Sequence, residues 1–523
     1  MANGKFRTSR FSDFSGGINL RNSADRINDN QFQELINMSS EGNKLIVIKW
    51  FKFLKQLTGD STVGKVQWME LFSNYLICVY KANLYIYNLS TWVVTIQTSA
   101  VTSQTDRFQI VINKLTDISI VLINTNPSTT EDIRAYEFNI STLAFVNKTF
   151  SWLSNKNFKC GAFYEGKLML GGNPSAPSVL YFSKTFWATS LANIYDFSSY
   201  NSASQVVGDG EAIVSFASNN TEFFIFKTNS IWKIVGSTDT WSSYAYQLRQ
   251  ETSTWIINPF CIVNVEKDII YFDGTTFRRI SYEQNIQALS DSAIGKDIEP
   301  WIKSLSQNQR DNAFMVYAYP YVKLILRSNT SQVNDFWILY NVVDKGFSTQ
   351  IGIDGSIWAN GIFNNQRVAY IGSQFDSSIF QDNESLSYND GDISFKSRSK
   401  KVNFGDGVNY KQFLRMEFNW IITIWLQAYI TIYVDGKEIT TKQIDSSPSS
   451  ELAPTFGATV FGASPIGSNN NVDEGTTTSF ETKIELYNSG REIEYIISGN
   501  GQWILELNGQ TITYKHTLAY DIH

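Results

Sequence analysis

Short strands with alternating apolar residues, joined in pairs by tight turns, recur through most of this 523-residue chain. The clearest pair occupies residues 74–96, with the sequence NYLICVYKANLYIYNLSTWVVTI. Tyr75 and Ile77 lie two positions apart before a turn that contains asparagine, and Leu84 and Ile86 do so after it. Because side chains at every second position share one face of a strand, this pattern predicts a β-hairpin.

Similar hairpins return at intervals of roughly 35–60 residues, the interval expected of four-stranded propeller blades. They are ISIVLINTN with IRAYEFNISTLAFV, GKLMLGG with SVLYFS, EFFIFKTNSIWKIVGS, DIIYFDGTTFRRIS, FMVYAYPYVKLILRS with FWILYNV, and SIWANGIF with VAYIGS. We therefore expect an all-β fold in which residues 51–394 form one β-propeller of about six blades, although the spacing also fits seven. Modest helical patterns occur only around residues 29–38 and 290–305, and Pro300 either limits the length of the second or lies near its start.

The character of the chain changes near residue 395, where a strand-rich tail begins. This tail predicts a separate C-terminal β-sandwich or barrel-like domain over residues 395–523. Within it, residues 446–478 are rich in Ser, Gly, Pro and Asn, which predicts a long exposed loop.

A basic cluster stands at the start of this tail. It consists of Lys396, Arg398, Lys400 and Lys401. The cluster is a candidate for contact with DNA phosphates or with an acidic neighbouring subunit. The alternative is a solvated strand edge between domains, where charges prevent wrong strand pairing.

Charge and cysteine content limit the classes of function. The formal net charge is −6 and the sequence pI is about 5.3, which argues against tight sequence-independent binding to nucleic acid. The three cysteines, Cys78, Cys160 and Cys261, show no paired spacing and predict free, buried thiols in a protein assembled in a reducing cytoplasm. The first residues lack the apolar stretch of a signal peptide, and no apolar run is long enough to predict a membrane span.

The usual signatures of an enzyme are weak. The chain has two histidines, both near its C-terminus, and no phosphate-binding glycine loop. Glycoside hydrolysis needs only two carboxylates, and acidic residues on predicted loops could supply such a pair: Asp209, Glu211, Asp273, Asp291 and Asp354. With 49 acidic side chains, chance placement explains them better, so we predict a protein without catalytic activity, cofactor or metal.

The N-terminal segment, residues 1–50, is predicted to be an extended arm that docks on another surface. Adjacent glycines permit a sharp turn there, and flanking aromatic rings offer large, rigid anchors. The residues expected to make the contact are Phe11, Phe14, Gly16, Gly17 and Ile18.

The opening F-S-D-F-S-G-G-I-N-L, followed by D-N-Q-F-Q-E-L-I-N-M, resembles the start of tail nozzle proteins from short-tailed double-stranded DNA phages. Residues 161–183, 208–236 and 269–294 resemble the central blades of that family in order and style, and the phrase GREIEYIISG resembles its last domain. The resemblance is spread over most of the chain, and it is carried by the order of the phrases.

This resemblance implies a structural protein of the virion tail. Six copies would form a ring below the portal and its adaptor, and duplex DNA would pass through the ring on leaving the capsid. Further partners implied are tail fibres or tailspikes and a tail needle. Acidic loops lining the lumen would repel phosphates and so prevent adhesion of the DNA.

Two other functions fit the same fold. A carbohydrate-binding propeller could attach to a host surface by stacking aromatic residues on sugars, and it would bind glycans as an isolated protein. A glycan-degrading propeller enzyme is the third possibility, and release of reducing sugar would detect it.

Overall fold

The computed structural model describes most of the chain. The described residues are 6–57, 64–101, 108–114, 118–124, 133–151, 153, 157–185, 194–197, 203–208, 210–219, 222–235, 247–283, 288–327, 335–352, 355–385, 393–405, 407–423, 427–445, 477–501 and 505–516. The loop predicted at 446–478 therefore lies almost wholly outside them.

Strands account for 63% of the described residues and helices for 4%, so the all-β prediction is confirmed. The chain divides into two compact units. Unit 1 contains residues 1–52, 340–350 and 383–523, and unit 2 contains residues 53–339 and 351–382.

Unit 2 is built from sheets of four strands. Among the described residues, six such sheets stand alone, and β27–β30 follow one another in the same sequential order within a longer sheet. Sheet by sheet, the strands are β7 (Val66–Phe72), β8 (Tyr75–Tyr80), β9 (Asn83–Asn88) and β10 (Val94–Gln97); β11 (Phe108–Lys114), β12 (Ile118–Asn124), β13 (Arg134–Asn139) and β14 (Ala144–Lys148); β15 (Cys160–Tyr164), β16 (Lys167–Gly171), β17 (Val179–Phe182) and β18 (Ala203–Val206); β19 (Ile213–Ser218), β20 (Phe223–Lys227), β21 (Ile231–Val235) and β22 (Gln247–Thr252); β23 (Ile262–Val265), β24 (Asp268–Phe272), β25 (Phe277–Glu283) and β26 (Ala288–Ala293); β27 (Phe314–Ala318), β28 (Tyr321–Leu326), β29 (Phe336–Asn341) and β30 (Phe347–Ile351); and β31 (Ile357–Phe363), β32 (Gln366–Gly372), β33 (Ser378–Ser385) and β6 (Trp50–Gln56).

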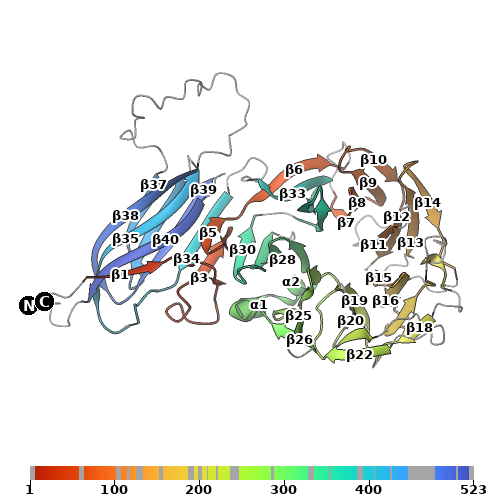
Figure 1. Cartoon of the computed structure of the whole chain (residues 1–523), viewed down its shortest axis with the longest axis horizontal. Helices are drawn as coiled ribbons and strands as arrows, with labels where there is room; N and C mark the ends of the chain where they lie inside the picture. The colour runs from red at the N-terminus through yellow and green to blue at the C-terminus, as the bar shows by residue number, and fades with distance from the viewer. Residues whose placement is uncertain are drawn as a thin grey trace, which may run out of the picture. The chain divides into compact units, whose positions relative to one another are not determined.

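The first strand of each group lies innermost, and these strands contact one another in cyclic order from β7 through β11, β15, β19, β23 and β27 to β31, which returns to β7. Figure 1 shows the resulting ring of sheets. The ring is closed by β6, which comes before β7 in the chain yet forms the outer strand of the last sheet. Ser356 reinforces the closure, since its hydroxyl donates to the carbonyl oxygen of Val66 at 2.8 Å. This arrangement is that of a β-propeller.

In the described residues, six sheets of four strands stand alone and β27 to β30 belong to a longer sheet, whereas the sequence predicted about six blades and left seven open. The hairpin of the last sheet, β31 and β32, was among the predicted pairs, but its outer strand β6 was not, because β6 lies about three hundred residues before the other three strands. Pairing across such a distance leaves no local pattern in the sequence.

Packing between sheets explains why most strands are apolar on both faces. In β8, Leu76, Cys78 and Tyr80 pack in a cluster with residues of the last sheet, including Tyr370. The alternate residues Ile77 and Val79 pack in a second cluster with residues of the β11–β14 sheet. Each sheet is therefore buried on both faces by its two neighbours, which is the main apolar contribution to the stability of the ring.

Three short helices connect β26 to β27: η2 (Lys296–Ile298), α1 (Glu299–Ser304) and α2 (Gln307–Asp311). Pro300 occupies the first turn of α1, as predicted, because proline lacks the N–H that this position leaves unpaired. Ser306 and Gln309 form a reciprocal capping box at the start of α2.

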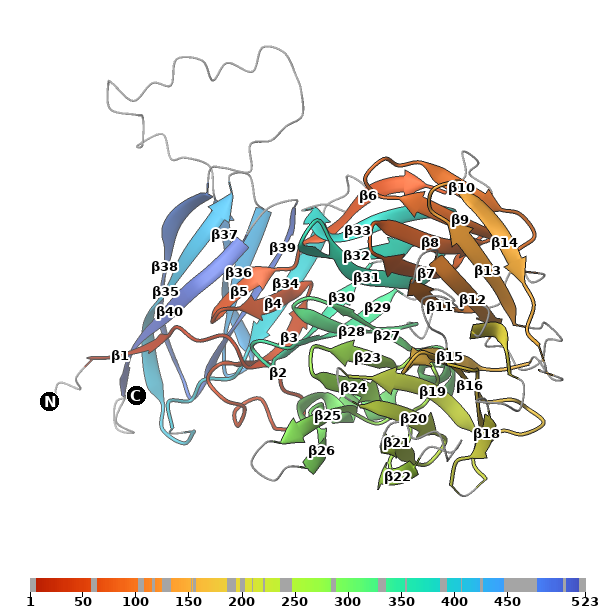
Figure 2. The ribbon, with the colours of Figure 1, turned by 45° about the vertical axis from the view of Figure 1, so that its right-hand side comes forward.

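Unit 1 contains two groups of paired strands. One has the order β38-β35-β40-β5-β4, with β1 paired to β40, and the other has the order β30-β3-β34-β39-β36-β37, with β2 paired to β3. Figure 2 labels the strands of both groups. Rings from the two groups meet where Phe418 of β35 lies edge-on to Tyr495 of β39, with centroids 5.2 Å apart. The strands are β1 (Phe6–Phe11), β2 (Gly17–Ile18), β3 (Gln31–Ile36), β4 (Met38–Glu41), β5 (Lys44–Val47), β34 (Ile393–Ser399), β35 (Lys411–Thr423), β36 (Gln427–Val434), β37 (Lys437–Asp445), β38 (Thr477–Gly490), β39 (Ile493–Gly501) and β40 (Leu505–His516).

The N-terminal segment differs from its prediction in two respects. Residues 1–50 are not a separate arm, because β1, β3 and β5 pair with the C-terminal strands β40 and β34 in unit 1. The helical turn predicted around residues 29–38 is the strand β3 instead, which pairs with β34. The expected domain boundary at residue 394 also fails, because it falls inside β34.

Candidate functional site

A cavity of about 330 Å³ lies at the axis of the propeller ring. Its described lining comes mainly from the innermost strands β7, β11, β19, β23, β27 and β31. These strands contribute because they surround the axis, so residues from six distant parts of the sequence meet there. Ligand sites are typically concave pockets lined by apolar and aromatic side chains with a few polar groups, and this lining is of that kind.

An aromatic pair crosses the axis inside this cavity. Trp68 of β7 and Phe260, which precedes β23, have ring centroids 5.6 Å apart and are tilted by 46°. Their sheets are not neighbours in the ring, so the contact spans its centre. The two rings therefore fill part of the axis.

Several polar groups on the lining connect neighbouring sheets. The amide of Gln109 on β11 donates to the carbonyl oxygen of Gly161 and accepts from the N–H of the same residue on β15, both at 3.0 Å. The hydroxyl of Ser215 on β19 donates to the carbonyl oxygen of Pro259 at 3.2 Å. These side chains are structural, since their hydrogen bonds join adjacent sheets.

Glu70 is the one carboxylate of the described lining. It stands two residues after Trp68 on β7, so both side chains lie on the same face of the strand. Burial raises the pKa of Glu70 to about 8, and the neighbouring indole of Trp68 opposes this only in part. At neutral pH the empty cavity therefore holds a mostly protonated glutamate.

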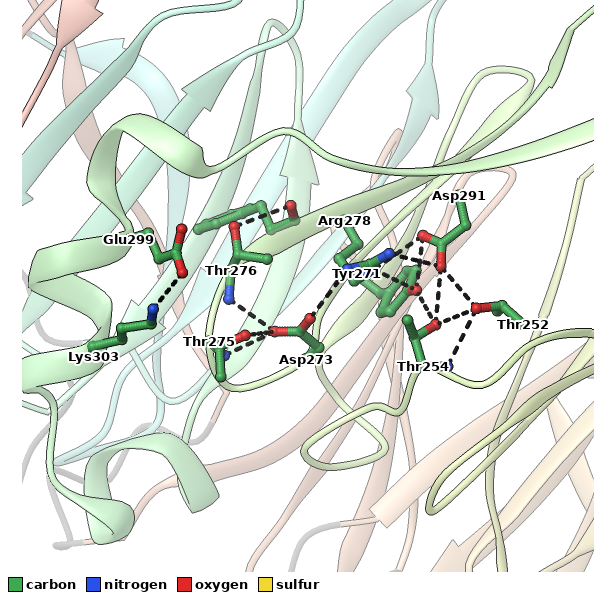
Figure 3. A network of polar contacts seen from close by, with 11 residues as sticks. Thr252, Thr254, Tyr271, Asp273, Thr275, Thr276, Arg278, Asp291, Glu299 and Lys303 are labelled. Atoms are coloured by element: carbon green, nitrogen blue, oxygen red, sulfur yellow. Dashed lines mark hydrogen bonds and ion pairs between the residues drawn. The ribbon is translucent and has the colours of Figure 1, made fainter. Parts of the chain in front are cut away.

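A second polar cluster surrounds Asp291 on β26 (Figure 3). Its two oxygens accept hydrogen bonds from Nε and a terminal nitrogen of Arg278 at 3.0 Å each, from Tyr271 at 3.0 Å, and from the hydroxyls of Thr252 and Thr254 at 3.1 and 3.0 Å. Burial and the charge of Asp291 raise the pKa of Tyr271. Five donors leave this carboxylate little free capacity, so the cluster acts to hold β24, β25 and β26 together.

Asp273 lies on the other side of Arg278, at 3.8 Å. Its Oδ1 accepts from the backbone N–H groups of Thr275 and Thr276, both at 2.8 Å, which fixes the turn between β24 and β25. The structure thus brings Asp273 and Asp291 together around one arginine, and both are occupied as structural acceptors. Of the other acidic candidates, Glu211 accepts from the backbone and amide of Asn229, while Asp209 and Asp354 lie outside the described residues.

The residues predicted to anchor the N-terminal arm on another surface are mostly buried within this chain. Phe14 is 2% exposed and packs on Phe32, with ring centroids 6.1 Å apart, and Ile18 is 5% exposed. Gly17 has φ +63°, and a Cβ there would lie 2.3 Å from the backbone nitrogen of Phe347. Gly16 is equally enclosed, with a Cβ position 2.6 Å from Gln31, and Phe11 is partly buried at its pairing with β40. The prediction that Phe14 anchors a docking arm is therefore wrong, because its side chain belongs to the core of unit 1.

Each residue of the basic cluster has an acidic partner in the same unit. The described ion pairs are Lys396–Glu34 at 2.7 Å, Arg398–Glu494 at 2.9 Å, Lys400–Asp29 at 2.6 Å and Lys401–Glu492 at 2.5 Å. Because these cations are already neutralised, the cluster is not a patch that attracts phosphate. The alternative of a solvated strand edge is also wrong, since β34 lies between β3 and β39.

A buried ion pair in unit 2 has no signature in the sequence. Lys323 of β28 donates to both oxygens of Asp382 on β33, at 2.9 and 2.7 Å, and the two side chains are 2% and 3% exposed. The ammonium also lies 4.8 Å from the ring centre of Trp358 and 5.5 Å from that of Trp337. No local pattern reveals such a pair, because its members are 59 residues apart and meet only in the folded ring.

The described part of the chain offers little other chemistry. Cys78, Cys160 and Cys261 are free and buried, as predicted, and burial raises the pKa of the first two thiols. No group of three or more His, Cys, Asp or Glu side chains in the described ranges is placed to hold a metal ion. In the same residues, no helix has both the length and the apolar character needed to cross a membrane.

No protein-family model and no curated protein matches this chain. Solved structures with a similar fold include an extracellular domain from B. thetaiotaomicron, with 9% identity and a TM-score of 0.41, aligned over 80% of this chain and 58% of its own length. YCF48 bound to D1 peptide has 9% identity and a TM-score of 0.38 over 64% of this chain and 94% of its own, and the Pan2 WD40 domain of Neurospora crassa has 5% and 0.38 over 64% and 95%. The chain thus spans little more than half of the first of these proteins, and likenesses at this level carry no conclusion about activity or partners.

Proposed function

We propose that this protein is a structural subunit of the tail nozzle of a short-tailed double-stranded DNA phage. In this proposal, a seven-bladed propeller and a β-sandwich formed from both ends of the chain work by geometry and electrostatics. Six copies form a ring that attaches below the portal and its adaptor, and DNA leaves through that ring.

The observation that carries the proposal is how the phrases resembling the nozzle family correspond to structural units. Residues 161–183 include β15 to β17, residues 208–236 include β19 to β21, and residues 269–294 include β24 to β26. Each phrase therefore supplies most of one sheet, in the order of the ring. The opening phrase and the GREIEYIISG phrase, which lie at opposite ends of the sequence, both belong to unit 1.

The aromatic contact across the ring limits the path that DNA could take. Because Trp68 and Phe260 meet across the centre of the ring, duplex DNA does not pass through the axis of a single propeller. The lumen of the proposed nozzle accordingly lies between copies of the chain. A cyclic arrangement with heterologous contacts creates such a lumen.

Exposed apolar side chains on outer strands favour contact with a second copy. Val94 and Ile96 of β10 are 37% and 46% exposed, and Val146 of β14 is 50% exposed. These strands are the outer edges of two neighbouring sheets (Figure 1). Apolar residues gathered on unpaired edges are typical of surfaces that another chain covers.

The first test is the mass of the purified protein, alone and mixed with its tail adaptor, by light scattering, with negative-stain imaging of any large species. We expect rings with a central hole wide enough for duplex DNA. A protein that stays monomeric, ignores the adaptor and binds host glycans on an array would refute the nozzle and favour the carbohydrate-binding alternative.

Charged variants test the contact surface. Ile96→Lys and Val146→Lys should each prevent ring formation and leave the thermal unfolding of the monomer unchanged, because both side chains are exposed. Ile362→Lys is the matched control, since Ile362 is 63% exposed on a different strand, β31. Rings formed equally well by all three variants would exclude β10 and β14 as the contact.

A further inference from the structure

The axial cavity contains one acid and no base. None of its described lining residues is Lys, Arg or His, and Glu70 forms no ion pair among the described residues. Glu70 is half-buried, and a carboxylate that is partly withdrawn from water without a charged partner is unfavourable. A ligand that brings one positive charge would remove this imbalance.

Aromatic residues make the same cavity favourable for a cation. Trp68 and Phe260 both line it, and Trp68 shares its strand face with Glu70. The negative face of an aromatic ring attracts a cation within about 6 Å, and tryptophan does so best. Acid and aromatic rings together complement the charge and the alkyl part of an organic ammonium ion.

The volume limits the ligand to a small one. At about 330 Å³, the cavity is at the lower end of the range for small-molecule sites. The polar groups of Gln109, Ser215 and Asn360 already bond to other parts of the chain, and Glu70 is the one carboxylate among the described lining residues.

We propose that this cavity binds a small organic cation with a single primary ammonium group, which pairs with Glu70 while its alkyl part contacts Trp68 and Phe260. A primary ammonium fits because it donates hydrogen bonds to a carboxylate. This inference does not depend on the nozzle proposal, since it rests on unit 2 alone.

Binding is coupled to ionisation of Glu70. Besides Tyr317 on the lining, the titratable side chains on β8 and β32, two strands that contact β7, are Tyr75, Cys78, Tyr80, Arg367 and Tyr370. None of them moves the pKa of Glu70, which burial raises to about 8. Because a cation pairs with the ionised form, binding at pH 7 releases the proton of Glu70, and binding at pH 9 releases almost none.

Isothermal titration calorimetry of the whole protein with n-butylammonium chloride tests the proposal. With a pKa of about 8, roughly one tenth of Glu70 is ionised at pH 7 and nine tenths at pH 9, so the affinity should rise about tenfold between them. Titrations at pH 7 in buffers of different ionisation enthalpy should show that each bound butylammonium releases about 0.9 proton from Glu70. The neutral analogue 1-butanol should bind at least tenfold more weakly at pH 9.

Three variants separate this site from nonspecific binding. Glu70→Gln should lower butylammonium affinity at pH 9 at least tenfold, and Phe260→Leu should weaken butylammonium more than butanol. Glu299→Gln, which is the same substitution on the surface helix α1, should leave the affinity for butylammonium unchanged. The proposal is overturned if the wild type binds butylammonium no better than butanol, or if Glu70→Gln, shown by thermal unfolding to be folded, binds as well as the wild type.

Discussion

The buried pair of Lys323 and Asp382 allows a quantitative test of how the propeller is held together. It joins β28 to β33, so it links two neighbouring sheets of the ring. Asp382→Asn keeps the shape of the side chain but removes its charge. The variant leaves an ammonium that is 2% exposed facing a neutral amide.

We expect this variant to lose about 3–5 kcal/mol of unfolding free energy, as is usual when one partner of a buried pair is removed. The loss is limited because burial already lowers the pKa of Lys323, and Asp382 is the group that opposes this shift. In the variant, Lys323 can therefore become neutral. Since the unfolded chain then binds more protons than the folded one, the stability of the variant should recover as pH rises toward the unfolded pKa of about 10.4.

Urea unfolding followed by tryptophan fluorescence measures the change, because Trp337 and Trp358 lie beside the ammonium. The double variant Lys323→Met with Asp382→Leu should be close to the wild type, since it removes both charges. Glu299→Gln, which breaks the exposed pair with Lys303, should change stability by less than about 0.5 kcal/mol. The reasoning would be refuted if Asp382→Asn were as stable as the wild type, or if the double variant lost as much unfolding free energy as Asp382→Asn.

Three further predictions concern other positions. Because the folded pKa of Glu70 exceeds its unfolded value, the unfolding free energy should fall by up to about 5 kcal/mol as pH rises from 4.5 to 8. Glu70→Gln should abolish this pH dependence in urea titrations. An unchanged pH dependence in the variant would contradict the raised pKa of Glu70. Gly17→Ala should destabilise unit 1 by about 1–3 kcal/mol or more, because residue 17 has a positive φ and a Cβ there would meet the backbone of Phe347. A melting temperature equal to that of the wild type would exclude this strain. Gln109→Ala should lower the unfolding free energy of unit 2 by about 1–3 kcal/mol, since it removes both hydrogen bonds to Gly161. Gln109→Glu keeps only an acceptor and should be no more stable than Gln109→Ala. A neutral effect of Gln109→Ala would show that these two hydrogen bonds are not stabilising.

The periodicity of the sequence was sufficient to predict the strands and the propeller, because alternation and turn residues are local properties of the chain. The 74–96 hairpin and the position of Pro300 at a helix start are examples. The same local patterns misled where pairing is remote. Residues 31–36 look modestly helical but form β3, because their partner β34 begins more than 350 residues later.

The sequence by itself determined the all-β class, the buried free thiols and the balance of charges that argues against tight DNA binding. Only the tertiary structure decided what individual charges and rings do. In the folded chain, the four residues of the basic cluster form ion pairs with Glu34, Asp29, Glu492 and Glu494. Phe14 is buried in unit 1. The tertiary structure also assembled Glu70, Trp68 and Phe260 around one cavity. The physical reason is that burial and ion pairing depend on neighbours in space, and closing the ring brings together residues that are far apart along the chain.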